Sequence, residues 1–352
     1  MKERVAVLVS GGVDSAVALH TLVRDGRYDI VAFYLKIWLE DDLAFLGRCP
    51  WEEDLTFVRM VCAQVDVPLE IVSLQQEYRS RVVEYSLAEL QAGRTPSSDI
   101  LCNSLIKFGA FLERIGPDFD LLASGHYARL RVADGVTHLL RGVDPVKDQT
   151  YFLCRLTQRQ VAQCLFPIGE LPKTEVRVLA ERWCLANAGR PDSQGICFLG
   201  QIPYDEFVWF HLGDRPGAIV EIGSGRELGE HRGLWFHTIG QRRGLGLAGG
   251  PWYVVEKDVQ SNTIVVVHRD TLADHQRNNF TVEDINWIAG APQSSRLTVR
   301  LRHGARLWPA EVEVVGGKSV RVQLDDGDPG IAAGQFAVFY DDEECLGGGP
   351  IG

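Results

Sequence analysis

The strongest constraint on the fold lies near the start of the chain, where a strand pattern runs directly into a glycine-containing loop. Residues 5–9 are uniformly apolar, residues 10–15 read SGGVDS, and a helical pattern extends from Asp14 to Val23. Paired glycines let the backbone approach an anion closely, and amide groups at a helix N-terminus point toward that anion. This order predicts a phosphate-binding unit at the start of an α/β domain.

The first 200 residues continue to alternate short apolar runs with helical patterns. Strands are expected at residues 30–35, 69–74 and 121–124, and helices at residues 54–65, 77–90 and 104–114. Such alternation predicts a doubly wound parallel sheet with helices on both faces. Ligands of these sheets bind at the carboxyl ends of the strands, which is where the loop of residues 10–15 lies.

The residue pattern of the sequence changes after about residue 200, where Gly and Pro separate short strand-like segments. Strands are expected at residues 297–301, 310–315, 320–324 and 337–340, with hairpin turns at Gly316-Gly317 and Asp326-Gly327. We therefore expect three domains: a catalytic α/β domain (1–200), a small central domain (201–275) and a C-terminal β-barrel (276–352).

Charge and apolar content limit the classes of partner. The formal net charge of −11 argues against indiscriminate nucleic-acid binding, although arginines can still gather on one face. No apolar run approaches the roughly 18 residues of a membrane span. The strand pattern at residues 5–9 leaves little room for a signal or transit peptide. We expect a cytoplasmic monomer without membrane contact, or a protein of a plastid or other organelle interior if a leader is removed.

The eight cysteines contain no CxxC pair, so most are expected to be reduced thiols. Cys62, Cys154, Cys164 and Cys184 lie in apolar helical contexts and are interpreted as core residues. Cys102 and Cys197 instead lie in polar, loop-like motifs. These two are 95 positions apart, so only a fold could bring them together.

Several motifs together resemble a known family. The segment SGGVDS resembles the PP-loop of the ATP pyrophosphatase (adenine nucleotide α-hydrolase-like) superfamily, whose members adenylate an oxygen and release pyrophosphate. The further motifs are GRTPSSDILCN and IKF (93–103, 106–108), SGHYA (124–128), KDQTYF (147–152), DSQGICF (192–198), TIGQRRGL (238–245), PWYVV (251–255) and GQFAV (334–338). In this order they resemble the tRNA-specific 2-thiouridylases. CPWEED (49–54) and WFHTIGQRRGL resemble the plastid-type members.

The resemblance implies a sulfur-transfer site built from two thiols and a carboxyl group. Cys197 would carry sulfur as a persulfide, Cys102 would attack or resolve it, and Asp99 would act as general acid or base. Thiolate carriers and resolving thiols are the groups that such chemistry requires. As an alternative, Asp99, Cys102 and Cys197 could hold a [4Fe–4S] cluster with one iron open.

The resemblance also implies the residues that bind ATP, with Asp14 beside Mg²⁺. These residues are Leu8, Val9, Ser10, Gly11, Gly12, Val13, Asp14, Ser15, Leu35 and Gly125.

The tRNA contacts implied by the resemblance are spread over the whole chain. They are Ser97, Ser98, Asp99, His126, Lys147, Asp148, Gln149, Leu301, Arg302 and Gln335. Arg242 and Arg243 are candidates for phosphate contacts. Ser97-Ser98 stands where the family has Asn-Pro, which predicts a looser loop, and Leu301 stands where the family has an aromatic residue.

The expected reaction is ATP-dependent adenylation of the C2 oxygen of the wobble uridine, followed by sulfur delivery from a persulfide that a donor protein supplies. The target base must leave its stack to reach a thiol. Two alternatives remain open: a PP-loop synthetase acting on a small carboxylate or purine, and a non-catalytic RNA-binding protein.

Overall fold

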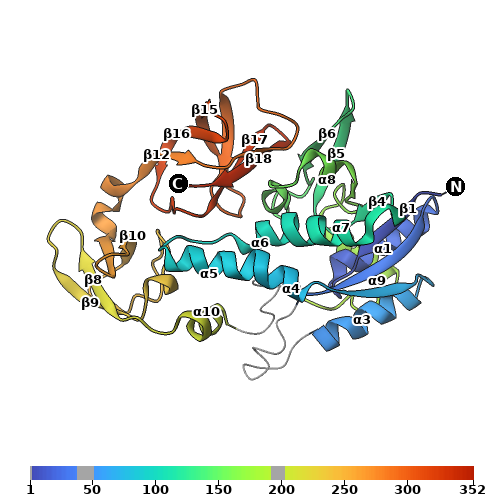
Figure 1. Ribbon diagram of the computed structural model, residues 1–352, viewed down its shortest axis with the longest axis horizontal. Helices are drawn as coiled ribbons and strands as arrows, with labels where there is room; N and C mark the ends of the chain where they lie inside the picture. Colours follow the sequence, from blue (N-terminus) through green and yellow to red (C-terminus); the bar gives the residue numbers. More distant parts are fainter. Residues whose placement is uncertain (1, 38–50, 192–202) are drawn as a thin grey trace.

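The computed structural model describes residues 2–37, 51–191 and 203–352, and its N-terminal part is built on a five-stranded parallel sheet (Figure 1). The strand order is β3 (Leu69–Ser73), β2 (Asp29–Lys36), β1 (Arg4–Leu8), β4 (Leu121–Ala123) and β7 (Cys164–Leu165). The expected parallel sheet is thereby confirmed.

The side chains of strand β1 alternate between two separate cores, as the two-residue repeat of a strand requires. Val5 and Val7 pack with helices α1 (Val13–Asp25), α3 (Trp51–Ala63) and α9 (Lys173–Arg182). Ala6 and Leu8 pack with the helices on the opposite face. Helices therefore cover both faces of the sheet, and the doubly wound arrangement is confirmed.

The helices on that opposite face form two long segments with π-helical turns. The first comprises α4 (Gln75–Tyr78), η2 (Arg79–Val83) and α5 (Glu84–Gln91), and the second comprises α6 (Ser98–Leu101), η3 (Cys102–Ala110) and α7 (Phe111–Ile115). The second segment begins six residues before the expected start at 104. Cys102 is therefore helical, and the expectation of a loop at this cysteine was wrong.

The central part contains a four-stranded sheet of order β10 (Trp252–Asp258), β11 (Thr263–His268), β8 (Gly217–Glu221) and β9 (Glu227–His231). Helix α10 (Tyr204–Leu212) precedes this sheet, and the short helices η6 (Leu234–Phe236) and η7 (Arg269–His275) accompany it. No helix among the described residues is long and apolar enough to cross a membrane.

The C-terminal barrel shares its sheet with a hairpin of the N-terminal part. The barrel strands are β12 (Arg277–Val282), β13 (Asn286–Trp287), β14 (Arg296–Arg300), β15 (Trp308–Gly316), β16 (Ser319–Asp328), β17 (Phe336–Asp341) and β18 (Glu344–Pro350). The hairpin of β5 (Ala128–Ala133) and β6 (Val136–Arg141) extends this sheet, because β6 pairs with β18. The sheet thus contains strands from both sides of the domain boundary that is expected at residue 200.

One of the two hairpin turns expected in the barrel is confirmed. Gly316 ends β15 and Gly317 begins the turn to β16, and both glycines have positive φ angles. Asp326-Gly327 makes no turn, so this expectation was wrong. These two residues belong to β16, which stays extended because it pairs with β12 as far as Asp328.

A buried ion pair joins the N-terminal domain to the barrel. The Asp148 carboxylate accepts hydrogen bonds from Arg300 Nη1 (2.9 Å) and from Arg141 Nε (3.1 Å). The side chains of Asp148 and Arg300 are each 1% exposed. The Arg300 guanidinium also lies 5.0 Å from the centre of the Tyr340 ring. The segment after β6 is therefore attached to strand β14 of the barrel.

Replacing Arg300 by Met is expected to lower the free energy of unfolding by about 3–5 kcal/mol, because Asp148 loses a partner inside the protein. Urea unfolding followed by tryptophan fluorescence measures this change. Arg296→Met is the matched control on the same strand, since Arg296 pairs with Asp325 at the surface. An equal loss in both variants would contradict a special role for the buried pair.

Candidate active site

The loop of residues 10–15 lies at the carboxyl end of β1 and folds around the Ser15 hydroxyl. That hydroxyl donates to the Gly12 carbonyl (3.0 Å) and accepts from the Ser10 amide (3.1 Å). Gly11 has a φ of +82°, and a Cβ there would lie 2.9 Å from the Asp54 carbonyl oxygen, so a side chain is excluded. The loop is thus a compact turn that leads into the N-terminus of α1, where anions bind.

Other expected ATP-binding residues lie around this loop. A Cβ on Gly125 would come within 2.8 Å of the Ser15 amide, so Gly125 packs directly against the start of α1. The side chains of Leu8, Val9 and Val13 are buried, so only their backbone atoms could contact a nucleotide. Leu35 lies partly buried in β2, the strand next to β1.

Asp14 is held by two side chains that the sequence does not identify as its partners. Its Oδ1 accepts from Lys173 Nζ (2.6 Å) and from the Tyr127 hydroxyl (2.8 Å). Lys173 is the first residue of α9, far from the loop in sequence. A cation is therefore available beside the anion-binding loop, together with a carboxylate of the kind that Mg²⁺ prefers.

The Gly11 carbonyl is fixed by a second pair of unforeseen residues. It accepts from Asn187 Nδ2 (2.8 Å) and from Arg190 Nη1 (3.1 Å), and Arg190 also pairs with Asp54 (2.7 Å). Arg190 in turn lies over the Phe57 ring. These contacts hold the loop in one conformation and add a second positive charge near it.

A cleft of about 620 Å³ lies where the three parts of the chain meet. Asp99 lines this cleft; burial raises the pKa of its carboxyl group, and the charge of Lys107 opposes that rise. Five expected tRNA-binding residues share the cleft, and other lining residues include Arg243 and several aromatic side chains. The expected tRNA-binding residues in the cleft are Ser97, Ser98, Asp99, Arg302 and Gln335. The aromatic side chains in the cleft include Tyr151, Phe152, Tyr204, Trp235 and Phe236.

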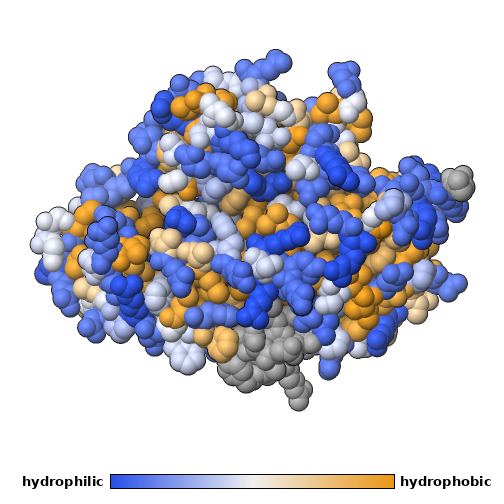
Figure 2. Space-filling model, viewed as in Figure 1, coloured by the Kyte–Doolittle hydropathy of each residue, from blue (hydrophilic) through white to orange (hydrophobic). Residues whose placement is uncertain are grey.

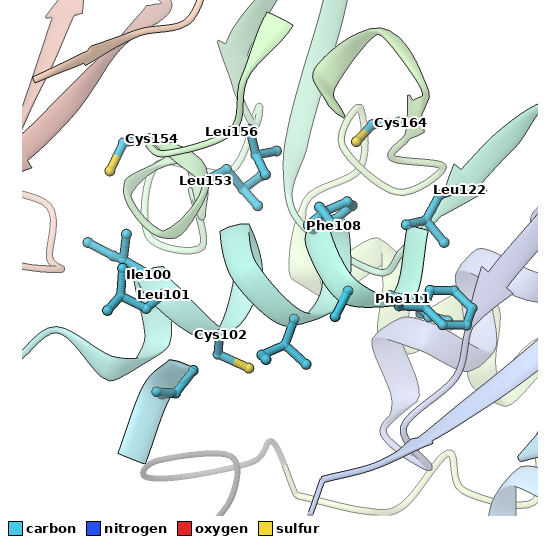
Figure 3. Close-up of a cluster of buried hydrophobic side chains, with 14 of the residues drawn as sticks. Ile100, Leu101, Cys102, Phe108, Phe111, Leu122, Leu153, Cys154, Leu156 and Cys164 are labelled. Atoms are coloured by element: carbon cyan, nitrogen blue, oxygen red, sulfur yellow. The ribbon is translucent and has the colours of Figure 1, made fainter. Parts of the chain in front are cut away.

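Cys102 lies one helical turn after Asp99 and is 2% exposed. Figure 3 shows it on the side of the helix opposite Cys154 and Cys164. Burial raises the pKa of Cys154 to about 12 and that of Cys164 still further, as expected for core thiols. Cys184 is exposed after α9, so its core interpretation was wrong.

The other expected sulfur carrier, Cys197, lies outside the described residues, as do the whole motif of residues 192–198 and Cys49-Pro50. Within the described ranges, no three His, Cys, Asp or Glu side chains are grouped to hold a metal ion. Asp99 and Cys102 alone are too few protein ligands for an iron–sulfur cluster.

Three other expected tRNA contacts do not line the cleft. His126 Nδ1 lies 2.8 Å from the Ser124 hydroxyl, and burial lowers the pKa of this histidine to about 3, so its ring is neutral at pH 7. Gln149 Oε1 accepts from the Tyr127 amide (3.0 Å), while Lys147 is partly exposed.

The side chains of two expected tRNA contacts are buried, so only their backbone atoms could meet RNA. Asp148 is buried and bonded to two arginines, and Leu301 is 1% exposed in the barrel core. Side chains without solvent access cannot touch RNA directly. The neighbouring Arg302 keeps a half-exposed guanidinium that pairs with Asp328 (2.5 Å).

The surface of the molecule is consistent with polar partners. On the face drawn in Figure 2, hydrophilic residues lie between the apolar ones, and no continuous apolar patch covers that face.

Comparisons with known proteins cover almost the whole chain. Residues 3–201 match a family described as the tRNA methyl transferase HUP domain, residues 205–268 match its PRC-barrel domain, and residues 277–351 match the aminomethyltransferase beta-barrel domain. The tRNA-specific 2-thiouridylase MnmA of Parabacteroides distasonis is 44% identical over 99% of this chain and 98% of that protein. The MnmA of Porphyromonas gingivalis is 42% identical over the same shares.

Among solved structures, the U34-tRNA thiolase NcsA from Methanococcus maripaludis, determined with its [4Fe-4S] cluster, aligns with 57% of this chain and 63% of its own. Its identity is 16% and its TM-score is 0.33, a similarity too low to support an argument. The full-length relatives are bacterial and do not support the expected resemblance to plastid-type members. At 44% identity over nearly its entire length, the chain belongs to the MnmA family of tRNA-specific 2-thiouridylases.

Proposed function

We propose that this protein uses ATP to activate the C2 oxygen of the wobble uridine in tRNA and replaces that oxygen with sulfur. The observation that carries the proposal is the helix α6–η3. It presents Asp99 to a cleft lined by aromatic and arginine side chains, and it holds Cys102 one turn farther on. The same domain contains the anion-binding loop, so activation and sulfur transfer can occur in one protein.

The adenylation step is supported by the groups around the loop. Ser10, Ser15 and the α1 amides would hold the phosphates, and Lys173 would stabilise the pyrophosphate as it leaves. Mg²⁺ would be held by Asp14 and would neutralise phosphate charge. Since Asp14 now bonds Lys173, binding of Mg²⁺ to this carboxylate would release the lysine toward the phosphates.

Two thiols supply the electrons that the sulfur-transfer step requires. Adenylation turns the C2 oxygen into a leaving group, and the terminal sulfur of a Cys197 persulfide then forms the bond to C2 while AMP departs. Cys102 attacks the Cys197 sulfur, so two electrons from the pair reduce the transferred sulfur and a Cys102–Cys197 disulfide remains. A donor protein renews the persulfide after an external thiol has reduced the disulfide. Asp99 would move the proton at the uridine.

The tRNA would be held by side chains that line the cleft or lie beside it. Arg243 and Arg302 suit phosphate groups, and Gln335 and the serines before Asp99 suit the base. Lys147, Gln149 and His126 would contact the RNA outside the cleft. The volume of about 620 Å³ is large enough for an extruded nucleotide.

The thiol assignment is tested by mass spectrometry of nucleosides from tRNA incubated with the protein, ATP and a persulfide source. Cys197→Ser and Cys102→Ser are each expected to lower 2-thiouridine formation at least 100-fold, because each removes a reacting sulfur. Cys184→Ser is the control, since that thiol is exposed and lies outside the cleft.

Four other outcomes would point elsewhere. Normal thiolation by either reactive-cysteine variant would contradict the mechanism. Adenylation of a small carboxylate or purine without tRNA thiolation would favour a synthetase, and tRNA binding without ATP turnover would favour a binding protein. Visible absorbance after anaerobic iron–sulfur reconstitution, lost in Cys197→Ala, would favour a [4Fe–4S] cluster on Asp99, Cys102 and Cys197.

Lys173→Met is expected to raise the KM for ATP roughly 10- to 100-fold, because a charged hydrogen-bond donor to phosphate is lost. Pyrophosphate release at varied ATP concentrations measures this change, and the tRNA affinity should stay within twofold of the wild type. Lys318→Met, on the exposed surface of the barrel, is the control. An unchanged KM for ATP in Lys173→Met would exclude the lysine from the nucleotide site.

A further inference from the structure

Two rings from distant parts of the chain stack against each other in the cleft. Phe152 belongs to η5 (Thr150–Leu153), and His303 follows strand β14 of the barrel. Their ring centres are 4.6 Å apart and their planes differ by 30°. The Tyr151 ring packs beside both, at 5.5 Å from Phe152 and 6.3 Å from His303. The pair is a small aromatic surface shared by two domains.

The outer ring of this pair is accessible. Both rings line the cleft that also contains Asp99, and His303 is exposed whereas Phe152 is half-buried. One face of the imidazole covers Phe152, and the exposure of His303 leaves part of its ring accessible from the cleft. Exposed flat rings with one free face are the surfaces on which single-stranded nucleic-acid bases stack.

The charge of His303 suits stacking better than phosphate binding. Partial burial of its ring lowers the pKa of the His303 imidazole, and the positive charges of Arg300 and Lys147 lower it further, while Asp148 acts in the opposite direction. The ring is therefore neutral at pH 7. A neutral ring gives no ionic contact to a phosphate, so its contribution comes from its face.

Arg302, the residue before His303, supplies the charge that the imidazole lacks. Its guanidinium is half-exposed, lines the same cleft and is oriented by Asp328 (2.5 Å) and by the Gly330 carbonyl (3.4 Å). A fixed guanidinium beside a stacking ring matches the phosphate and the base of one nucleotide.

We propose that Phe152 and His303 form a stacking platform for the nucleotide next to the target uridine. The inference rests on the proposed function, which assigns the target base to Asp99. Tyr151 lies against both rings of the platform, and the charge of Asp99 acts on its hydroxyl group. Tyr151, both rings of the platform and Asp99 all line the same cleft, so the platform and the target base would belong to one binding surface.

The platform determines where the RNA strand enters and has little preference for base identity, because every base offers a similar face. Leu301 cannot serve in this way, since its side chain is buried in the barrel core. His303 therefore supplies the ring that the sequence lacks at position 301.

The test uses an anticodon stem-loop RNA with 2-aminopurine in place of the nucleotide on the 5′ or the 3′ side of the target. In the wild-type protein, stacking on the platform quenches the fluorescence of one of these two probes. His303→Ala is expected to abolish that quenching and to weaken RNA binding roughly 5- to 100-fold. His303→Phe, which keeps a ring, is expected to restore both, and the KM for ATP should not change.

His275→Ala is the matched control, because this histidine is partly exposed and does not line the cleft. Equal quenching and affinity in His303→Ala and wild type would overturn the platform, even in a protein that thiolates tRNA. Quenching that depends on His303 in a protein without thiolation would support the platform and reject the proposed reaction. Thermal unfolding of each variant confirms that the loss is local, and Phe152→Leu gives a second, independent test.

Discussion

The buried ion pair between Asp148 and Arg300, together with the pairing of β6 with β18, fixes how the N-terminal domain and the barrel fit together. Charges inside a protein are tolerated only with close partners, and Asp148 has Arg141, Arg300 and the Thr150 hydroxyl (2.7 Å). Because Thr150 begins η5 and Arg300 ends β14, the pair brings the residues that follow each of them together. The cleft, which the stacked rings of Phe152 and His303 line together, adjoins that attachment.

A second constraint acts on the helix that carries Asp99 and Cys102. Nine residues of this helix are π-helical, a form that is rare and often found at functional sites. Gln160 stabilises it, because its Nε2 donates to the carbonyls of Ser104 (3.0 Å) and Phe108 (2.6 Å). The Gln160 Oε1 accepts from the amide of Thr157, so both polar atoms of the Gln160 side chain are held by hydrogen bonds.

The sequence predicted those features that depend on neighbouring residues. The doubly wound sheet and the loop of residues 10–15 follow from local patterns of apolar residues and glycines, and both were correct. The contacts of Lys173 and Arg190 with the loop could not be predicted, because these residues lie more than 150 positions away and only the fold brings them there. Asp148 illustrates the same limit: its motif implied a contact with RNA, and only the fold shows that its side chain is buried in an ion pair.

The serine pair before Asp99 shows how the structure can replace a missing restraint. A proline restricts a loop by fixing φ, so its absence at Ser98 predicted a looser segment. The structure instead buries Ser98, whose hydroxyl lies 2.8 Å from that of Ser86, and Ser86 donates to the Val82 carbonyl (2.6 Å). This chain of hydrogen bonds ties the start of α6 to the η2–α5 helix. Asp99 is therefore held by side-chain contacts between two helices where a proline would act through the backbone alone.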